Sequence, residues 1–251
     1  MTLQFLPPPA GSPPPPDHAG LTRAADILDA LVDRRTCTPE SVGPVVPTGI
    51  PAFDEPCGGL ALGTVTALIG PPGSGSTWLL LRAALHAAAH DRPTLFCALD
   101  MTLASFAVGL AHVVTGAATA PDGGNRVGDV ALRAAATELA ELPLYVEVGK
   151  TVATHDIFAV ADSELVDFIV VDNVGLLLPS GSATDLKHCA TDLNVAALTS
   201  ITVALTDDDV DVACLGADLL SAADTIASYD PIEQSCRVVV TRAWPSARGE
   251  P

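Results

Sequence analysis

The sequence predicts an α/β fold with a mostly parallel central sheet and helices on both faces. The main observation is that short apolar runs, typical of buried strands, alternate with Ala- and Leu-rich runs at helical spacing. A second observation is that two of these apolar runs end in a carboxylate, at Asp100 and at Asp172. Ligands of parallel sheets lie at the carboxyl ends of the strands, so we expect any site to lie at that edge.

The first 44 residues differ in composition from the rest of the chain. Residues 1–20 include Pro7–Pro9 and Pro13–Pro16, and this composition favours extended polyproline structure and cannot pack a core. Residues 21–44 should form a linker with one short amphipathic helix, expected at Leu21–Leu31. We therefore expect a Pro-rich tail, a short helix and linker, and one domain over residues 45–251.

Within that domain, each element follows from its local pattern. Glycines at 58, 59 and 63 punctuate the chain before the first buried strand, 65–69, and a Leu- and Ala-rich helix is expected at 78–90. Further strands are expected at 94–99, 144–148, 168–171 and 196–203, and a closing hairpin at 225–229 and 237–241. Helices are expected at 102–115, 127–139, near 155–162, at 184–193 and near 215–223.

The charge of the chain argues against two classes of partner. Thirty acidic and twelve basic residues give a net charge of −18, the wrong sign for a surface that neutralises nucleic-acid phosphates. The acidic run Thr206–Asp211 is read as a solvated turn, with a metal site as the alternative. No charged start precedes an apolar run, and no eighteen-residue stretch is wholly apolar. These patterns predict a soluble, cytoplasmic protein without a membrane partner, for which DNA is a poor ligand.

The six cysteines do not form a metal-binding pattern. No C-x-x-C pair occurs, and His188 next to Cys189 is the only neighbouring histidine. Reduced and mostly buried thiols are the expected state, with a metal site as the alternative.

The stretch between the first strand and its helix reads as a phosphate-binding loop. Its eight residues are Gly70, Pro71, Pro72, Gly73, Ser74, Gly75, Ser76 and Thr77. In the pattern G-x-x-x-x-G-K-[ST], backbone amides and the following helix N-terminus hold phosphates, the lysine reaches the β- and γ-phosphates, and the hydroxyl holds Mg²⁺. Here the lysine position is Ser76, so the amides are expected to remain while the strongest charge is missing. The alternative is a tight packing turn.

The two strand-ending carboxylates are the other candidate site residues. Asp172 follows a buried strand, where a carboxylate without a partner would be costly. Asp100 follows another such strand, and it also fits the role of cap for the helix expected to begin near Thr102.

In their order along the chain, these motifs resemble the RecA-type motor domain of the DnaB family of replicative helicases, over about residues 45–249. The landmarks are T-G-I-P-A-F-D from Thr48, G-G-L-A-L-G from Gly58, the phosphate-binding loop, T-L-F-C-A-L-D-M from Thr94, D-F-I-V-V-D-N from Asp167, D-L-N-V-A-A-L-T-S from Asp192 and R-A-W-P from Arg242. The resemblance implies a RecA-like P-loop NTPase fold that binds ATP and Mg²⁺.

The resemblance also assigns roles. Thr77 and Asp172 would hold Mg²⁺, and Asp100 would stand where the family has the glutamate that activates water. Ser200 would end the strand that senses the γ-phosphate. Arg242 would be an arginine finger that reaches the nucleotide of a neighbouring subunit, which implies a head-to-tail homo-oligomer.

Several positions depart from the family pattern. Lysine is replaced by Ser76, glutamate by Asp100, glutamine by Ile201 and a second cation by Val240. These departures predict a degenerate domain with weak or no ATP hydrolysis, acting as a regulatory or structural nucleotide-binding protein.

Two alternatives stay open. The first is an active ATPase or DNA helicase whose phosphate cation comes from Arg82, Lys150 or Lys187. The second is an interaction module whose Pro-rich tail binds a protein partner with an aromatic groove.

Overall fold

The computed structural model describes residues 45–116, 128–149, 154–177, 183–203, 217–230 and 235–241. All of them belong to one compact unit spanning residues 42–251. The predicted tail and short helix lie outside the described residues, as do Lys150, the acidic run at 206–211 and Arg242. The predicted domain boundary at residue 45 therefore stays a prediction.

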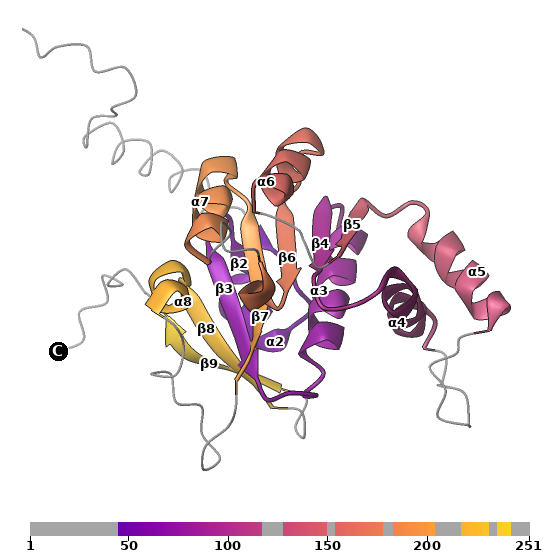
Figure 1. Cartoon of the computed structure of the whole chain (residues 1–251), viewed down its shortest axis with the longest axis horizontal. Coiled ribbons are helices and arrows are strands. Elements are labelled where there is room, and N and C mark those ends of the chain that lie inside the picture. The colour runs from indigo at the N-terminus through magenta and orange to yellow at the C-terminus, as the bar shows by residue number, and fades with distance from the viewer. Residues whose placement is uncertain are drawn as a thin grey trace, which may run out of the picture. The chain divides into compact units, whose positions relative to one another are not determined.

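A seven-stranded sheet forms the centre of the domain, in the order β5-β4-β6-β7-β3-β8-β9 (Figure 1). The strands are β3 (Val65–Gly70), β4 (Thr94–Ala98), β5 (Leu144–Val148), β6 (Phe168–Asp172), β7 (Ala196–Thr202), β8 (Thr225–Asp230) and β9 (Ser235–Thr241). Neighbouring strands run parallel except for the hairpin of β8 and β9. The predicted mostly parallel sheet and closing hairpin are therefore confirmed.

Helices cover both faces of this sheet, as predicted (Figure 1). They are α2 (Pro51–Cys57), α3 (Ser76–Ala89), α4 (Leu103–Thr115), α5 (Asp129–Leu139), α6 (Thr154–Ser163), α7 (Ala183–Leu193) and α8 (Ala217–Ala222), with a 3₁₀ turn at Val174–Leu176. One face packs against α2, α3 and α4, and the other against α6, α7 and α8, while α5 packs on α4. Among the described helices, none has the length and hydropathy needed to cross a bilayer.

The central strands are buried on both faces, which explains their continuous apolar runs. In β3, Val65, Ala67 and Ile69 face one core cluster and Leu68 faces the other. Every residue of β3 is buried. Because β3 is held from both sides, the chain that leaves it at Gly70 starts from a fixed position.

A small structure before β3 was not predicted. Strands β1 (Val45–Val46) and β2 (Leu60–Ala61) form an antiparallel pair, with α2 between them. The Asp54 carboxylate accepts bonds from the amide of Thr48 at 2.9 Å and the amide of Gly49 at 2.6 Å, which closes the turn before α2. A Cβ at Gly59 would lie 2.1 Å from the carbonyl oxygen of Val46, so only glycine allows this pairing.

Three described cysteines are free thiols, and two of them, Cys97 and Cys189, are buried. Burial raises the pKa of Cys97 to about 12 and that of Cys189 to about 11, so both are protonated at neutral pH. These thiols agree with the prediction of reduced, buried cysteines. Within the described ranges, no three His, Cys, Asp or Glu side chains are placed to hold a metal ion together.

Candidate functional site

The predicted loop joins β3 to α3 as a tight turn. Gly73 has φ of 75° and Gly75 has φ of 87°, conformations that favour glycine. The amide of Ser74 donates to the carbonyl of Pro71 at 3.1 Å. A Cβ at Gly70 would lie 2.9 Å from the Ser74 hydroxyl, so the turn folds closely over the end of the strand. The glycines of the motif therefore stand where the backbone requires them.

Helix α3 begins at Ser76, two residues earlier than the sequence pattern predicted. Its cap, Gly75, has no side chain, and the first amide recorded with a carbonyl acceptor in its first turn is that of Leu79, bonded to Gly75 at 3.1 Å. By helix geometry, the amides of Ser76, Thr77 and Trp78 have no intrahelical acceptor. These amides and the positive end of the helix dipole form an arrangement suited to an anion.

The hydroxyl of Ser74 adds a further polar group to the loop. Ser74 is 8% exposed, and its Oγ has no hydrogen-bond partner among the described residues. A buried hydroxyl without a partner loses free energy relative to water, so an oxygen acceptor entering the loop would relieve that cost.

Asp172 is the centre of a small hydroxyl cluster at the carboxyl edge of the sheet. Its Oδ2 accepts from Thr77 Oγ1 at 2.8 Å, and its Oδ1 accepts from Ser200 Oγ at 2.8 Å. The Ser200 hydroxyl in turn accepts the amide of Asn173 at 2.8 Å. The structure thus brings together Thr77 and Asp172, the two residues that the sequence assigned to one Mg²⁺ ion.

The carboxylate of Asp172 lies in a low-dielectric environment, with 4% of its surface exposed. Burial raises its pKa above the ordinary value, and the two hydroxyl bonds oppose that shift. The charge of Asp100 raises the pKa of Asp172 further, so the two carboxylates lie close enough to interact. A cation near this pair would be electrostatically favourable.

Asp100 is exposed and follows β4, whose last residue Ala98 pairs with Asp172 in register. The alternative that Asp100 caps the next helix is wrong. The cap of α4 is Thr102, whose hydroxyl oxygen accepts the amide of Ser105 at 3.2 Å. Asp100 therefore lies at the sheet edge without a capping role.

Sequence reasoning placed Ser200 at a strand end but missed its bond to Asp172. The bond depends on β6 and β7 being neighbours, which local patterns do not reveal. Ile201, in the place of the family's glutamine, is half-buried and packs against the core cluster beneath α7. An apolar side chain there offers no hydrogen bond to a phosphate.

The structure places two of the three candidate substitute cations away from the loop. Arg82 lies six residues after Ser76, about 9 Å along the helix axis. Lys187 donates to the carbonyl of Gly63 at 2.8 Å and pairs with Asp224 at 2.7 Å. That pair sits at the beginning of β3, about 20 Å from Gly70 at the strand's other end. Lys150 lies outside the described residues.

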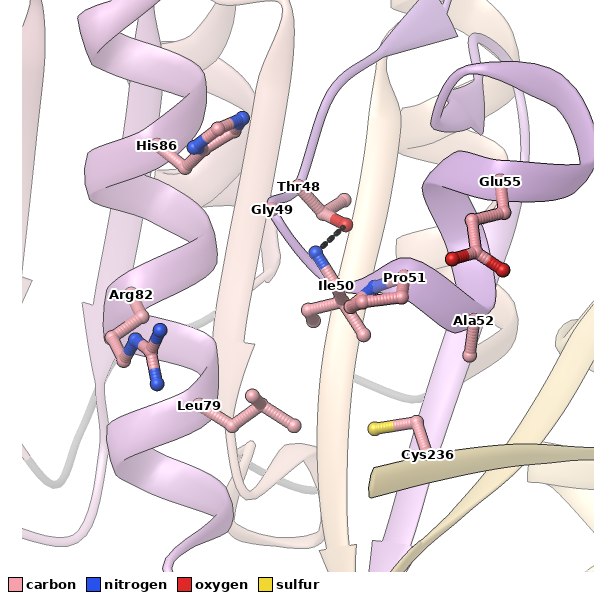
Figure 2. A pocket seen from close by; sticks show the side chains of 10 residues that line it. All are labelled: Thr48, Gly49, Ile50, Pro51, Ala52, Glu55, Leu79, Arg82, His86 and Cys236. Carbon is pink, nitrogen blue, oxygen red and sulfur yellow. Dashed lines mark hydrogen bonds between the residues drawn. The ribbon is translucent and has the colours of Figure 1, made fainter. Parts of the chain in front are cut away.

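Arg82 instead lines a cavity of about 440 Å³ between α3, the turn before α2 and β9 (Figure 2). Figure 2 shows Arg82 and His86 along one flank of α3, with Glu55 of α2 on the other side. Burial and the nearby His90 lower the pKa of His86, so its imidazole is neutral at neutral pH. None of the residues 70–77 lines this cavity, which is therefore separate from the loop.

No protein-family model and no curated protein matches this sequence. Solved structures do match: the ATPase domain of a DnaB-like helicase has a TM-score of 0.69 at 16% identity, over 82% of this chain and 82% of that chain. A DnaB-like replicative helicase, studied with its interactions with primase, has a TM-score of 0.60 at 16% identity. The chain has the helicase-like P-loop fold of DnaB-like ATPase domains.

The RecA-like fold implied by the ordered motifs is thereby confirmed. The second match covers 81% of this chain but 59% of the DnaB-like replicative helicase chain, so the present chain spans under two thirds of that protein. At 16% identity the likeness concerns the fold, and what the site does must be argued from its own residues.

Proposed function

We propose that this chain is a degenerate DnaB-helicase-like P-loop domain that binds ATP with Mg²⁺ weakly and hydrolyses it slowly or not at all. In this proposal it serves as a regulatory or structural nucleotide-binding protein. One observation carries the proposal: the loop has the geometry of an anion site, but Ser76 stands in the lysine position.

The residues of the loop fit a polyphosphate. The amides at the start of α3 and the unpartnered Ser74 hydroxyl point to an anion with several oxygens, for which the γ- and β-phosphates of ATP are the natural candidates. The positively charged end of α3 supplies part of the field that the missing lysine no longer provides. Binding is therefore expected to persist, at reduced affinity.

The residues also fit Mg²⁺. Thr77 and Asp172 present oxygens 2.8 Å apart, and oxygen atoms are the ligands that Mg²⁺ takes in proteins. They would hold the ion directly or through water, while Ser200 keeps the other carboxylate oxygen in place. When bound, the ion would neutralise charge on the phosphate oxygens.

Slow turnover follows from the groups that are missing. Removing one donor that stabilises the transition state can cost about 3–4 kcal/mol, and such losses need not add. Here the lysine is absent, Asp100 is one methylene shorter than glutamate, and Ile201 cannot donate a hydrogen bond. Together these changes support nucleotide binding without efficient hydrolysis.

The alternative, an active ATPase with a relocated cation, has less support. It needs a cation that reaches the loop, and Arg82 and Lys187 are placed elsewhere. The acidic balance of −18 also disfavours a DNA-translocating role.

Calorimetry tests the proposal most directly. ATP titrations with and without Mg²⁺ would be paired with a turnover assay, each with and without single-stranded DNA. Thr77→Val should remove most of the Mg²⁺-dependent gain in affinity. Thr191→Val, which removes an exposed hydroxyl bonded within α7, is the matched control and should change nothing. Turnover at rates typical of motor domains, or no ATP binding at millimolar concentration, would contradict the proposal.

A further inference from the structure

A second cavity, of about 230 Å³, adjoins the candidate site between the first turns of α3 and α4. Its lining includes Thr77, Trp78 and Leu81 from α3, and Met101, Ser105 and Phe106 from the segment after β4. Thr77 belongs both to this cavity and to the hydroxyl cluster around Asp172. The cavity therefore begins where the predicted phosphate site ends.

An aromatic wall gives this cavity its character. Trp78 is 44% exposed, although most large apolar side chains of the domain are buried. A Cβ built on Gly109 would lie 3.5 Å from the Trp78 ring, so the indole rests against α4 where that helix has no side chain. The His112 ring meets Trp78 edge-on, with centroids 6.3 Å apart. The exposed indole is thus held in place beside the loop.

We propose that this cavity takes the base of the nucleotide, which stacks on Trp78 while the phosphates lie in the loop. The inference rests on the proposed function, because it needs phosphates bound at Ser76 and Thr77. A cavity of 230 Å³ is smaller than the pockets that hold whole drug-sized ligands, and it suits one planar ring system. Its apolar lining favours a flat, weakly hydrated face over a charged group.

The polar content of the cavity predicts its selectivity. Apart from Thr77, the polar side chain in the lining is Ser105, whose hydroxyl already lies 3.0 Å from the Thr102 hydroxyl. Strong discrimination between ligands requires buried groups that pair with one ligand and stay unpaired with the other. With one shared hydroxyl, ATP and GTP should bind within about tenfold of each other.

The test compares ATP, GTP and inorganic tripolyphosphate, each with Mg²⁺, on the full chain by calorimetry. Ser105→Leu fills the cavity and keeps the backbone bond that caps α4. Ala104→Leu adds the same side chain one residue away, at an exposed position outside the lining, and is the control. Base stacking predicts that Ser105→Leu weakens ATP about fivefold to a hundredfold. Tripolyphosphate affinity should not change, and Ala104→Leu should bind both ligands as the wild type does.

A second readout needs no substitution in the cavity. In a Trp244→Phe background, Trp78 is the remaining tryptophan, and its fluorescence should change with ATP but not with tripolyphosphate. If ATP and tripolyphosphate both bind but Ser105→Leu leaves ATP affinity unchanged, the base lies elsewhere and this inference is wrong. If neither ligand binds the wild type, the proposed function fails and takes this inference with it.

Discussion

Restoring the missing lysine should strengthen nucleotide binding more than it strengthens hydrolysis. In Ser76→Lys, the ammonium would extend from the first residue of α3 toward the space above the loop. A charge-assisted hydrogen bond contributes about 1.5–3 kcal/mol, which corresponds to roughly a tenfold to hundredfold gain in ATP affinity. Turnover should stay low, because Asp100 and Ile201 remain unsuited to the transition state.

The same substitution should have little effect on folding. A cation in the first turn of a helix opposes the dipole by about 0.3–1 kcal/mol, and the higher helix propensity of lysine offsets part of that cost. Ser76 is half-buried, so the longer side chain can reach solvent. A change of this size shifts the melting temperature of a domain of this length by about 2–4 °C or less.

Calorimetry and a coupled ATPase assay would compare the wild type, Ser76→Lys and Ser76→Gln. The glutamine variant adds length without charge, so its ATP affinity should stay near that of the wild type. A wild type that already hydrolyses ATP at motor-domain rates, together with loss of activity in Ser76→Lys, would refute the reasoning and indicate a cation supplied from elsewhere. Equal ATP affinity in all three proteins would mean that the loop does not contact phosphate.

Three further predictions follow from charge and fold. Because burial raises the pKa of Asp172 in the folded state above the ordinary 3.8, deprotonation costs stability between these two values. On acidification from about pH 7 to about pH 4, the wild type should therefore gain unfolding free energy relative to Asp172→Asn; parallel urea curves at every pH would contradict this. With −18 net charge, the protein should not bind single-stranded DNA appreciably at physiological salt, and fluorescence anisotropy showing submicromolar affinity with a steep salt dependence would refute that. Self-association should be head to tail and weaken in Arg242→Ala, whereas sedimentation that shows only monomer at high concentration, with and without nucleotide, would contradict it.

The sequence predicted the sheet and its helices well because buried parallel strands have a strong signature. Continuous apolar runs such as Phe168–Val171 fit only a strand covered on both faces. The order of the strands was not predicted from these runs, because each run carries information only about its own burial. The short elements before β3 were missed because they depend on Asp54, which binds amides five and six residues away.

The candidate site was predicted from the order of motifs, and its contacts were not. Thr77 and Asp172 were assigned to one ion, and the structure places their oxygens in hydrogen-bond contact. The role of Ser200 depends on two strands meeting in the sheet, and the identity of the α4 cap depends on where that helix begins. Both are properties of the assembled fold, which is why a residue pattern left them open.

The structure also explains how the loop keeps its shape without its lysine. Its backbone is fixed by Gly73 and Gly75 and by the close approach of Ser74 to Gly70, none of which involves charge. Asp172 is held by two neutral hydroxyls, so its carboxylate does not need a lysine partner to be retained. The shape of the site and its catalytic charge are therefore separable in this domain. A chain that keeps the first without the second is suited to sensing or holding a nucleotide, in line with the proposed regulatory or structural role.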